Sequence, residues 1–337
     1  MLKNYSFLVI PALFLIVLTS CKKEGDPPVS AEEKNVWVTK PSFPGTGRKE
    51  AVSFVIGDKL YLGSGFGMEN NAQQFLRDFW QYNASTTSWV RIADFPGGVV
   101  GQAISFSMNG KGYLGLGYRL DCPPAGGICD HVYYRDLWAY TPQTNSWEKV
   151  VTFDIGEFDS SLGGTAFVIG NKAYIQNRNN LWEFDPFTNT LTPKKNLPDI
   201  LHYAVSFAIG DKGYIGTGFN GSSHKELYEY NPTTDQWTQK ASLGGGARYG
   251  AVGFALNGLG YIGGGIEGEY TNQGTYKDFW QYNPSADSWK KVEDYSGEGK
   301  FEAIADVVNG KAYVGTGDNR SSSKVTFEND FWEYVLK

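Results

Sequence analysis

Residues 79–89 read FWQYNASTTSW and residues 279–289 read FWQYNPSADSW, so the chain repeats one pattern at two distant places. In both copies a second Trp follows the first by nine residues. All ten Trp residues fit two such series, with a spacing of 44 to 58 residues along the first, which indicates an internal structural repeat. The first series is Trp80, Trp138, Trp182, Trp280 and Trp332, with Tyr228 in its gap; the second is Trp37, Trp89, Trp147, Trp237 and Trp289, with Leu191 in its gap.

A Tyr series precedes the Trp residues, and each member follows a two-residue turn such as Gly57-Asp58 or Asn109-Gly110. These pairs supply the positive φ angles of tight hairpin turns. Each repeat therefore predicts four antiparallel strands, a to d, in which b carries the Tyr, c the first Trp and d the second. The series comprises Tyr61, Tyr113, Tyr174, Tyr214, Tyr261 and Tyr313.

Four short strands per repeat of this length are typical of a β-propeller blade. The chain ends five residues after Trp332, before a strand d, whereas residues 37–45 (WVTKPSFPG) match the strand d at residues 89–97 (WVRIADFPG). An open ring would expose unpaired strand edges. We therefore predict an all-β, six-bladed propeller of four-stranded antiparallel blades over residues 35–337, with the last blade closed by the N-terminal strand.

The glycines after each repeated Tyr, the turn between strands c and d, and the trailing Trp resemble the kelch repeat of the galactose-oxidase-like superfamily. The resemblance covers roughly residues 35–337. It implies a propeller whose loop arginines line a ligand pocket. The third repeat departs most, because Gln176-Asn177-Arg178 replaces the glycines and Leu191 replaces the Trp, so we expect a weaker blade there.

Strand a alternates small and large side chains, which predicts that the small ones face the ring axis and the Phe residues fill the space between blades. The small set includes Ala51, Ser53, Ala103, Ser105, Ala204 and Ser206, and the Phe set is Phe54, Phe106, Phe167, Phe207 and Phe254. Asp306 takes the sixth Phe position. It is interpreted either as part of a partly exposed closing blade or as a functional or paired carboxylate.

The b–c loops vary in length while the a–b turns do not, and strand alternation places the b–c and d–a loops on one face of the ring. We call this the loop face and expect the ligand there. Its candidate ligand-binding residues are Arg48, Arg178, His202, Arg248, Tyr249, Lys300, Glu302 and Arg320, and its loops also carry His224 and Glu267.

The first twenty residues form a basic start and an apolar run, Phe7 to Leu18, that is too short for a membrane span and typical of a secretion signal. Leu18-Thr19-Ser20-Cys21 resembles a bacterial lipoprotein box. The resemblance implies cleavage after residue 20 and lipid on Cys21. Residues 21–34 then read as a flexible tether, and we expect an outer-membrane lipoprotein of the cell envelope, on either the periplasmic side or the cell surface.

Thirty basic and 36 acidic residues give a formal charge of −6, which argues against nucleic acid as a partner. Cys122 and Cys129 flank a Pro- and Gly-rich loop, where we expect a disulfide; a metal site with His131 is the weaker alternative. No metal and no cofactor are expected, and neither a nucleotide fingerprint followed by a helix nor a Gly-x-Ser-x-Gly elbow occurs. We expect a monomer.

Two functions remain. The favoured hypothesis is a lipid-anchored binding scaffold that presents its loop face to a glycan or a protein. The alternative is a sugar-active enzyme resembling periplasmic kelch mutarotases that act on sialic acid. Such an enzyme needs an acid/base pair and an Arg for the sugar carboxylate, and Glu302 with Arg48 and Arg248 would fill these roles.

Overall fold

The structure is a computed structural model, and it describes residues 1, 35–69, 72–121, 128–153, 163–268, 274–321 and 324–337. Across these residues the chain is all-β without a helix, which confirms the predicted fold class. Hence none of the described segments is a helix of the length and apolarity needed to cross a bilayer. The expected signal peptide and tether, residues 2–34, lie outside the described residues, and every described strand belongs to the compact unit Lys34–Lys337.

Six four-stranded antiparallel sheets occur among the described residues, one for each sequence repeat, and we number them as blades in chain order. Blade 1 contains β3 (Val52–Ile56), β4 (Lys59–Gly63), β7 (Phe79–Asn83) and β8 (Ser88–Ile92). Blade 2 contains β9 (Ile104–Met108), β10 (Lys111–Gly115), β13 (Asp136–Thr141) and β14 (Ser146–Thr152). Blade 3 contains β15 (Thr165–Ile169), β16 (Lys172–Asn177), β17 (Asn180–Asp185) and β18 (Thr190–Lys194).

The second half repeats this order. Blade 4 contains β19 (Val205–Ile209), β20 (Lys212–Gly216), β21 (Leu227–Asn231) and β22 (Gln236–Lys240). Blade 5 contains β23 (Val252–Leu256), β24 (Leu259–Gly263), β25 (Phe279–Asn283) and β26 (Ser288–Lys291). Blade 6 contains β27 (Ile304–Val308), β28 (Lys311–Gly315), β31 (Phe331–Val335) and β1 (Val36–Thr39). Blade 3 contains all four strands, although the third repeat departs most from the repeated sequence pattern.

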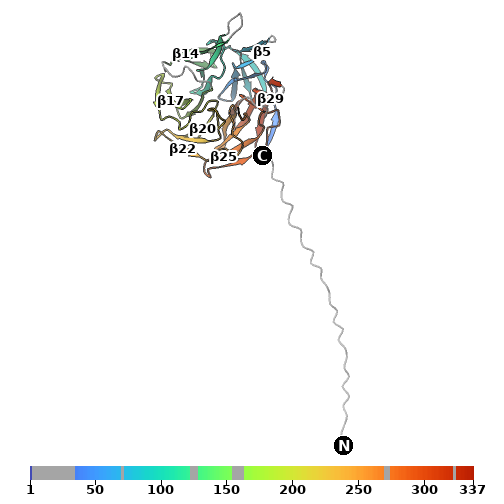
Figure 1. Ribbon diagram of the computed structural model, residues 1–337. Coiled ribbons are helices and arrows are strands. Elements are labelled where there is room, and N and C mark those ends of the chain that lie inside the picture. The colour runs from blue at the N-terminus through green and yellow to red at the C-terminus, as the bar shows by residue number, and fades with distance from the viewer. Residues whose placement is uncertain (2–34, 70–71, 122–127, 154–162, 269–273, 322–323) are drawn as a thin grey trace. The chain divides into compact units, whose positions relative to one another are not determined.

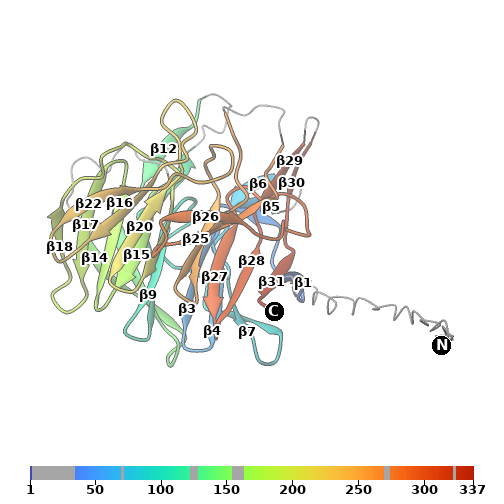
Figure 2. The same cartoon turned by 90° about the horizontal axis from the view of Figure 1, so that it is seen from below.

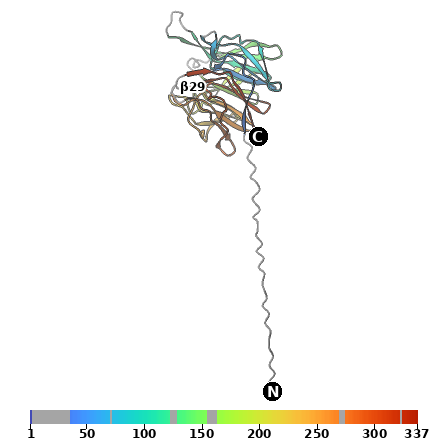
Figure 3. The same cartoon turned by 90° about the vertical axis from the view of Figure 1, so that its right-hand side faces the viewer.

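The predicted closure by the N-terminal strand is confirmed, because β1 pairs antiparallel with β31, with Trp37 opposite Tyr334. The first strands of successive blades contact one another, and β27 of blade 6 returns to contact β3 of blade 1. The sheets therefore surround a common axis (Figure 1). Figure 3 shows the blue and green strands of the first half beside the orange and red strands of the second.

The second Trp series connects neighbouring blades. Each indole N–H donates to a backbone carbonyl that lies just beyond strand d of the preceding blade, as from Trp89 to Pro41 at 3.0 Å. The same bond recurs from Trp147 to Ala93, from Trp237 to Lys195, from Trp289 to Ala241 and from Trp37 to Glu293. Trp37 thus continues the series across the closing blade.

The Phe residues of strand a also fix the order of the blades. A Cβ added to Gly112 of blade 2 would lie 2.0 Å from the Phe54 ring of blade 1, and Gly213 has the same relation to Phe167. Between blade 6 and blade 1 the larger side chain stands at the Gly position and the smaller one at the Phe position. Blade 1 offers Leu60, which packs with Ile304 and Tyr313 of blade 6, while blade 6 places the smaller Asp306 at the Phe position. Asp306 is partly exposed as a residue, in line with the first interpretation, but its Oδ2 atom is buried and makes no hydrogen bond.

The small residues of strand a line an axial channel of about 640 Å³, as predicted. The b–c loops contain strands that the sequence did not predict. They are β5 (Phe66–Glu69) and β6 (Ala72–Phe75), which join β2 (Arg48–Lys49), and the pairs β11 (Tyr118–Asp121) with β12 (Asp130–Tyr133) and β29 (Asp318–Ser321) with β30 (Lys324–Phe327). In Figure 2 these hairpins gather at one edge of the domain, above the strands of the blades.

Candidate functional site

A ring of left-handed residues surrounds the channel at the loop face, just before strand a of each blade. All six have φ between 48° and 73°, although four are not glycine: Glu50, Gln102, Gly163, Tyr203, Gly250 and Glu302. Backbone bonds link neighbours around this ring, from Glu50 N to Glu302 O at 3.0 Å and from Glu302 N to Gly250 O at 2.8 Å. Strained backbone persists where its surroundings hold it, and it is enriched at functional sites. We call this ring the mouth of the channel.

Two carboxylates of the mouth share one ammonium group. Lys49 Nζ lies 2.9 Å from Glu50 Oε1 and 2.8 Å from Glu302 Oε2. The side chains of the three residues are only 17%, 4% and 8% exposed, respectively. We call Lys49, Glu50 and Glu302 the mouth cluster. It lies where blade 6, the sheet that β1 completes, meets blade 1.

The electrostatics of the mouth cluster favour a proton on one carboxyl group. Burial, together with the negative charge of Glu50, raises the pKa of Glu302 to about 8, against the opposing pull of Lys49. Burial alone would lower the pKa of Lys49, but the charges of Glu302 and Glu50 raise it above its ordinary value. The ammonium therefore stays charged, while Glu302 keeps its proton to a higher pH than an ordinary carboxyl group does. A group with this pKa beside a second carboxylate is suited to proton transfer.

Further groups border the cluster. Phe301 lies beneath both the Lys49 ammonium, at 5.8 Å, and the Arg320 guanidinium, at 4.2 Å from the ring centroid. Arg320 also contacts the buried Asp318 at 3.2 Å, and burial raises the pKa of that carboxyl group. On the other side, an added Cβ at Gly101 would lie 2.3 Å from Glu50 Oε2, so only glycine leaves room for this carboxylate.

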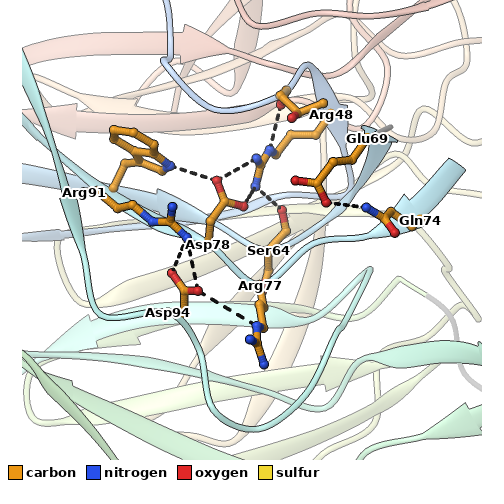
Figure 4. Close-up of polar contacts among 10 residues, drawn as sticks. Arg48, Ser64, Glu69, Gln74, Arg77, Asp78, Arg91 and Asp94 are labelled. Atoms are coloured by element: carbon orange, nitrogen blue, oxygen red, sulfur yellow. Dashed lines mark hydrogen bonds and ion pairs between the residues drawn. The ribbon is translucent and has the colours of Figure 1, made fainter. Parts of the chain in front are cut away.

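The side chains of the predicted ligand residues Arg48, Arg248 and Lys300 each pair with a carboxylate of the protein. The Arg48 side chain is fully buried and donates to the Ser64 carbonyl and, through two bonds of 2.7 and 3.0 Å, to the Asp78 carboxylate (Figure 4). Arg248 repeats this geometry with Asp278, and Lys300 pairs with Asp330. These three cations are thus engaged inside the protein, and their role in ligand binding stays a prediction.

The same carboxylates also hold the first Trp series in place. Asp78 accepts the indole N–H of Trp80 at 2.8 Å, and Asp278 accepts that of Trp280 at 2.6 Å. Although burial disfavours its charge, the hydrogen bonds and charge of Arg48, with Trp80, hold the pKa of Asp78 below its ordinary value. The Asp of the Asp-Phe-Trp motif therefore accepts hydrogen bonds from two side chains: the Trp of its own motif and the Arg of the d–a loop that precedes strand a.

The other predicted residues are spread over the loop face. His202 and Tyr249 form isolated bridges with Phe219 and Ile266, and Tyr249 is buried against Phe301 beside the mouth. Arg178 has a left-handed backbone in the tight β16–β17 turn of blade 3 and is partly exposed.

Two loop residues found in the sequence lie outside the mouth cluster. His224 pairs with Glu226 at 3.1 Å, and Glu267 accepts a bond from Tyr276 at 2.6 Å. Of the candidates, Glu302 is thus in the mouth cluster, and Arg320 and Tyr249 border it through Phe301.

The sequence analysis missed Lys49, Glu50 and Asp318. One signal would have found the first two: Lys49-Glu50 and Phe301-Glu302 occupy the same two positions of the repeat, eleven and twelve residues before the Tyr. Cys21 and Cys122 lie outside the described residues, while Cys129 is disulfide-bonded. Among the residues with described positions, no group of three or more His, Cys, Asp or Glu side chains is arranged to hold a metal ion.

Comparisons with known proteins agree with the architecture. No family model matches the chain. It is 27% identical over 304 residues to an N-acetylneuraminate epimerase of Haemophilus influenzae, covering 86% of this chain and 73% of that protein. It is 21% identical over 257 residues to mouse Kelch-like protein 35, covering 73% of this chain but only 40% of that protein.

A solved structure supports the same conclusion about the fold. The structure of YjhT superposes with a TM-score of 0.70 at 18% identity, covering 88% of this chain and 97% of that one. These relatives confirm the resemblance to kelch-type β-propellers.

Proposed function

We propose that the chain is an acid–base catalyst that interconverts the anomers of an acidic sugar at the mouth cluster. The observation that carries the proposal is the pair of adjacent buried carboxyl groups of Glu50 and Glu302, one of which is protonated near neutral pH, with a pKa of about 8. Such a pair can supply one proton and accept another in the same event.

The chemistry requires no cofactor. Glu50 accepts the proton of the anomeric hydroxyl group, the bond between the anomeric carbon and the ring oxygen breaks, and the ring oxygen takes the proton of Glu302. A carbonyl forms, and reclosure on its other face gives the second anomer while the two protons return. The proton count is unchanged over the cycle, because each carboxyl group ends in its starting state.

Two facts favour an acidic sugar as substrate. The H. influenzae relative is named for N-acetylneuraminate, a sugar acid. The cluster also contains Lys49 and has Arg320 beside it over the Phe301 ring; Lys49 pairs with Glu50 and Glu302, and Arg320 pairs with Asp318, so a sugar carboxylate would share these cations with the protein's own carboxylates. A carboxylate near these groups is favoured by charge and by guanidinium hydrogen bonding.

The test is the rate of anomer equilibration, followed by NMR after one anomer of N-acetylneuraminate is released into buffer. The wild-type protein should accelerate equilibration, and Glu302→Gln and Glu50→Gln should each lose about 10²- to 10⁴-fold of that acceleration. Glu267→Gln is the matched control, since it alters a loop-face carboxylate outside the cluster. No acceleration by the wild-type protein, or full activity in Glu302→Gln, would exclude the proposal.

A binding scaffold is the second candidate. The hairpins of β5–β6, β11–β12 and β29–β30 extend from the loop face around the mouth and offer exposed Met68 and Val325 to a partner. A glycan and peptide array supports this function if binding is saturable and Glu302→Gln leaves it unchanged.

We also propose lipid anchoring at Cys21, from the sequence motif alone. Metabolic labelling with an alkyne fatty acid in a bacterial host tests it. Label should appear on the wild-type chain and be absent from Cys21→Ala, and an unlabelled wild-type chain would exclude the anchor.

A further inference from the structure

The axial channel beneath the mouth is lined by neutral residues from the first strand of each blade, most of them Ala, Ser and Gly with some Val, Ile and Phe. Among the described residues that line its 640 Å³, Asp306 is the only one with a charge. Asp306 belongs to β27 and stands where the other blades have Phe, at the interface between blades 6 and 1. Its side chain hydrogen-bonds Ser53, an axis-facing residue of β3.

The carboxylate of Asp306 is not satisfied by the protein. Its Oδ2 atom is buried and makes no hydrogen bond, and no ion pair involves Asp306 among the described residues. A buried ionised group is costly unless it is paired or binds a metal ion. The electrostatics agree, since burial raises the pKa of Asp306 to about 6 despite the hydrogen bond from Ser53. At neutral pH and above, the channel therefore contains a negative charge without a counter-charge.

The hydroxyl groups of the channel are oriented to receive a cation. Ser105 Oγ donates to Ser53 O at 2.8 Å, and Ser206 Oγ donates to Ala166 O at 2.9 Å. Ser53 likewise uses its proton on Asp306. Because the hydrogens of Ser53 and Ser105 are used between blades, their hydroxyl oxygens offer lone pairs, which attract cations and repel anions; the Ser206 hydroxyl is also hydrogen-bonded to Thr165 Oγ1 at 2.6 Å.

We propose that the axial channel binds an alkali-metal ion, sodium or potassium, at Asp306 and the Ser53 hydroxyl oxygen. Carboxylate and hydroxyl oxygens are ligands for hard cations. A single carboxylate neutralises a monovalent ion, whereas protein sites for divalent ions gather several acidic ligands. The ion occupies the interface where the last blade meets the first, and it supplies there the counter-charge that the Phe-to-Asp replacement requires.

Thermal unfolding at pH 8 tests this at fixed ionic strength, with NaCl or KCl replacing tetramethylammonium chloride, whose cation cannot be coordinated by oxygen ligands. The melting temperature of the wild-type protein should rise by a few degrees, and the rise should saturate with alkali-ion concentration. Asp306→Asn removes the charge at nearly constant size and should abolish the response. Asp58→Asn, an exposed carboxylate in the first turn of blade 1, should retain it.

Crystals soaked in rubidium chloride give a second readout that does not depend on stability. An anomalous peak within about 3 Å of Asp306, absent from Asp306→Asn crystals, supports the site. A peak only beside Glu50 and Glu302, or an equal salt response in the wild-type and Asp306→Asn proteins, overturns it. Sugar isomerisation is measured separately. Failure of the ion-binding proposal therefore does not affect the test of the proposed function, and failure of the proposed function does not affect the test of ion binding.

Discussion

Replacing Arg248 by alanine distinguishes a structural arginine from a ligand-binding one. Its guanidinium is fully buried and makes two bonds to Asp278, with others to the carbonyls of Gly246 and Gly264. Removing one partner of a buried ion pair costs about 3 to 5 kcal/mol. Since the Asp278 side chain is 19% exposed, water hydrates part of the orphaned charge. We therefore expect a loss of about 3 kcal/mol, at the lower end of that range.

Equilibrium urea unfolding at pH 7 measures this loss. Arg248→Lys keeps the charge without the two-pronged geometry and should lose less. Arg91→Ala is the surface control, since it breaks the exposed pair with Asp94 (Figure 4), and it should change the unfolding free energy by no more than about 0.5 kcal/mol.

Acid should reduce the effect of Arg248→Ala. The arginine, through hydrogen bonds and charge and against the effect of burial, holds the pKa of folded Asp278 below its ordinary value of 3.8. The stability from this pair is therefore present above the unfolded pKa and is lost as pH falls through the folded one. The reasoning is refuted if Arg248→Ala unfolds like the wild-type protein at pH 7 and instead loses sugar isomerisation or glycan binding.

Four further predictions rest on other contacts of the structure. The isomerisation rate should fall as pH rises through about 8, where Glu302 loses its proton; a rate that is flat to pH 9.5 contradicts its role as the acid. Asp306→Asn should stabilise the protein in tetramethylammonium buffer by about 3 kcal/mol at pH 8 and by little at pH 4, since the pKa rises from 3.8 to about 6 on folding; a pH-independent difference in urea midpoints contradicts this. Trp37→Ala should cost about 3 to 5 kcal/mol, as for other buried aromatic side chains, and wild-type calorimetric stability would show that β1 is dispensable. Gly112→Leu should prevent soluble expression or strongly destabilise the fold, because Phe54 occupies the space of its Cβ, and a wild-type melting curve would show that blade order does not depend on this contact.

The architecture was predictable because its causes are local and repeated. The Trp register, the two-residue turns and the match between residues 37–45 and 89–97 each point to the same four-stranded unit. The closing strand was predictable because no second Trp follows Trp332 in the sixth repeat, whereas Trp37 precedes the first repeat without a Trp of the first series before it. The extra hairpins on the loop face were not predicted, since β5, β11 and β29 carry no repeated pattern.

The site was harder to predict, because the sequence does not show which charged side chains pair with each other in the folded protein. Arg48, Arg248 and Lys300 looked like ligand residues by position and type. Yet each pairs with an Asp thirty residues later, at the start of strand c. This spacing recurs three times in the sequence and would have marked them as structural. The raised pKa of Glu302 depends on Glu50 and on burial, which no spacing encodes.

Closure by β1 also constrains how the protein is made. β1 is synthesised before every other strand of the ring, whereas its partner β31 is synthesised after all of them. Through all of that time Trp37 lacks Tyr295 and Tyr334, the rings on which it finally packs. A nascent chain without β31 therefore leaves the edge of β1 unpaired, and we expect it to avoid aggregation only by remaining unfolded or by binding a chaperone until β31 has been synthesised.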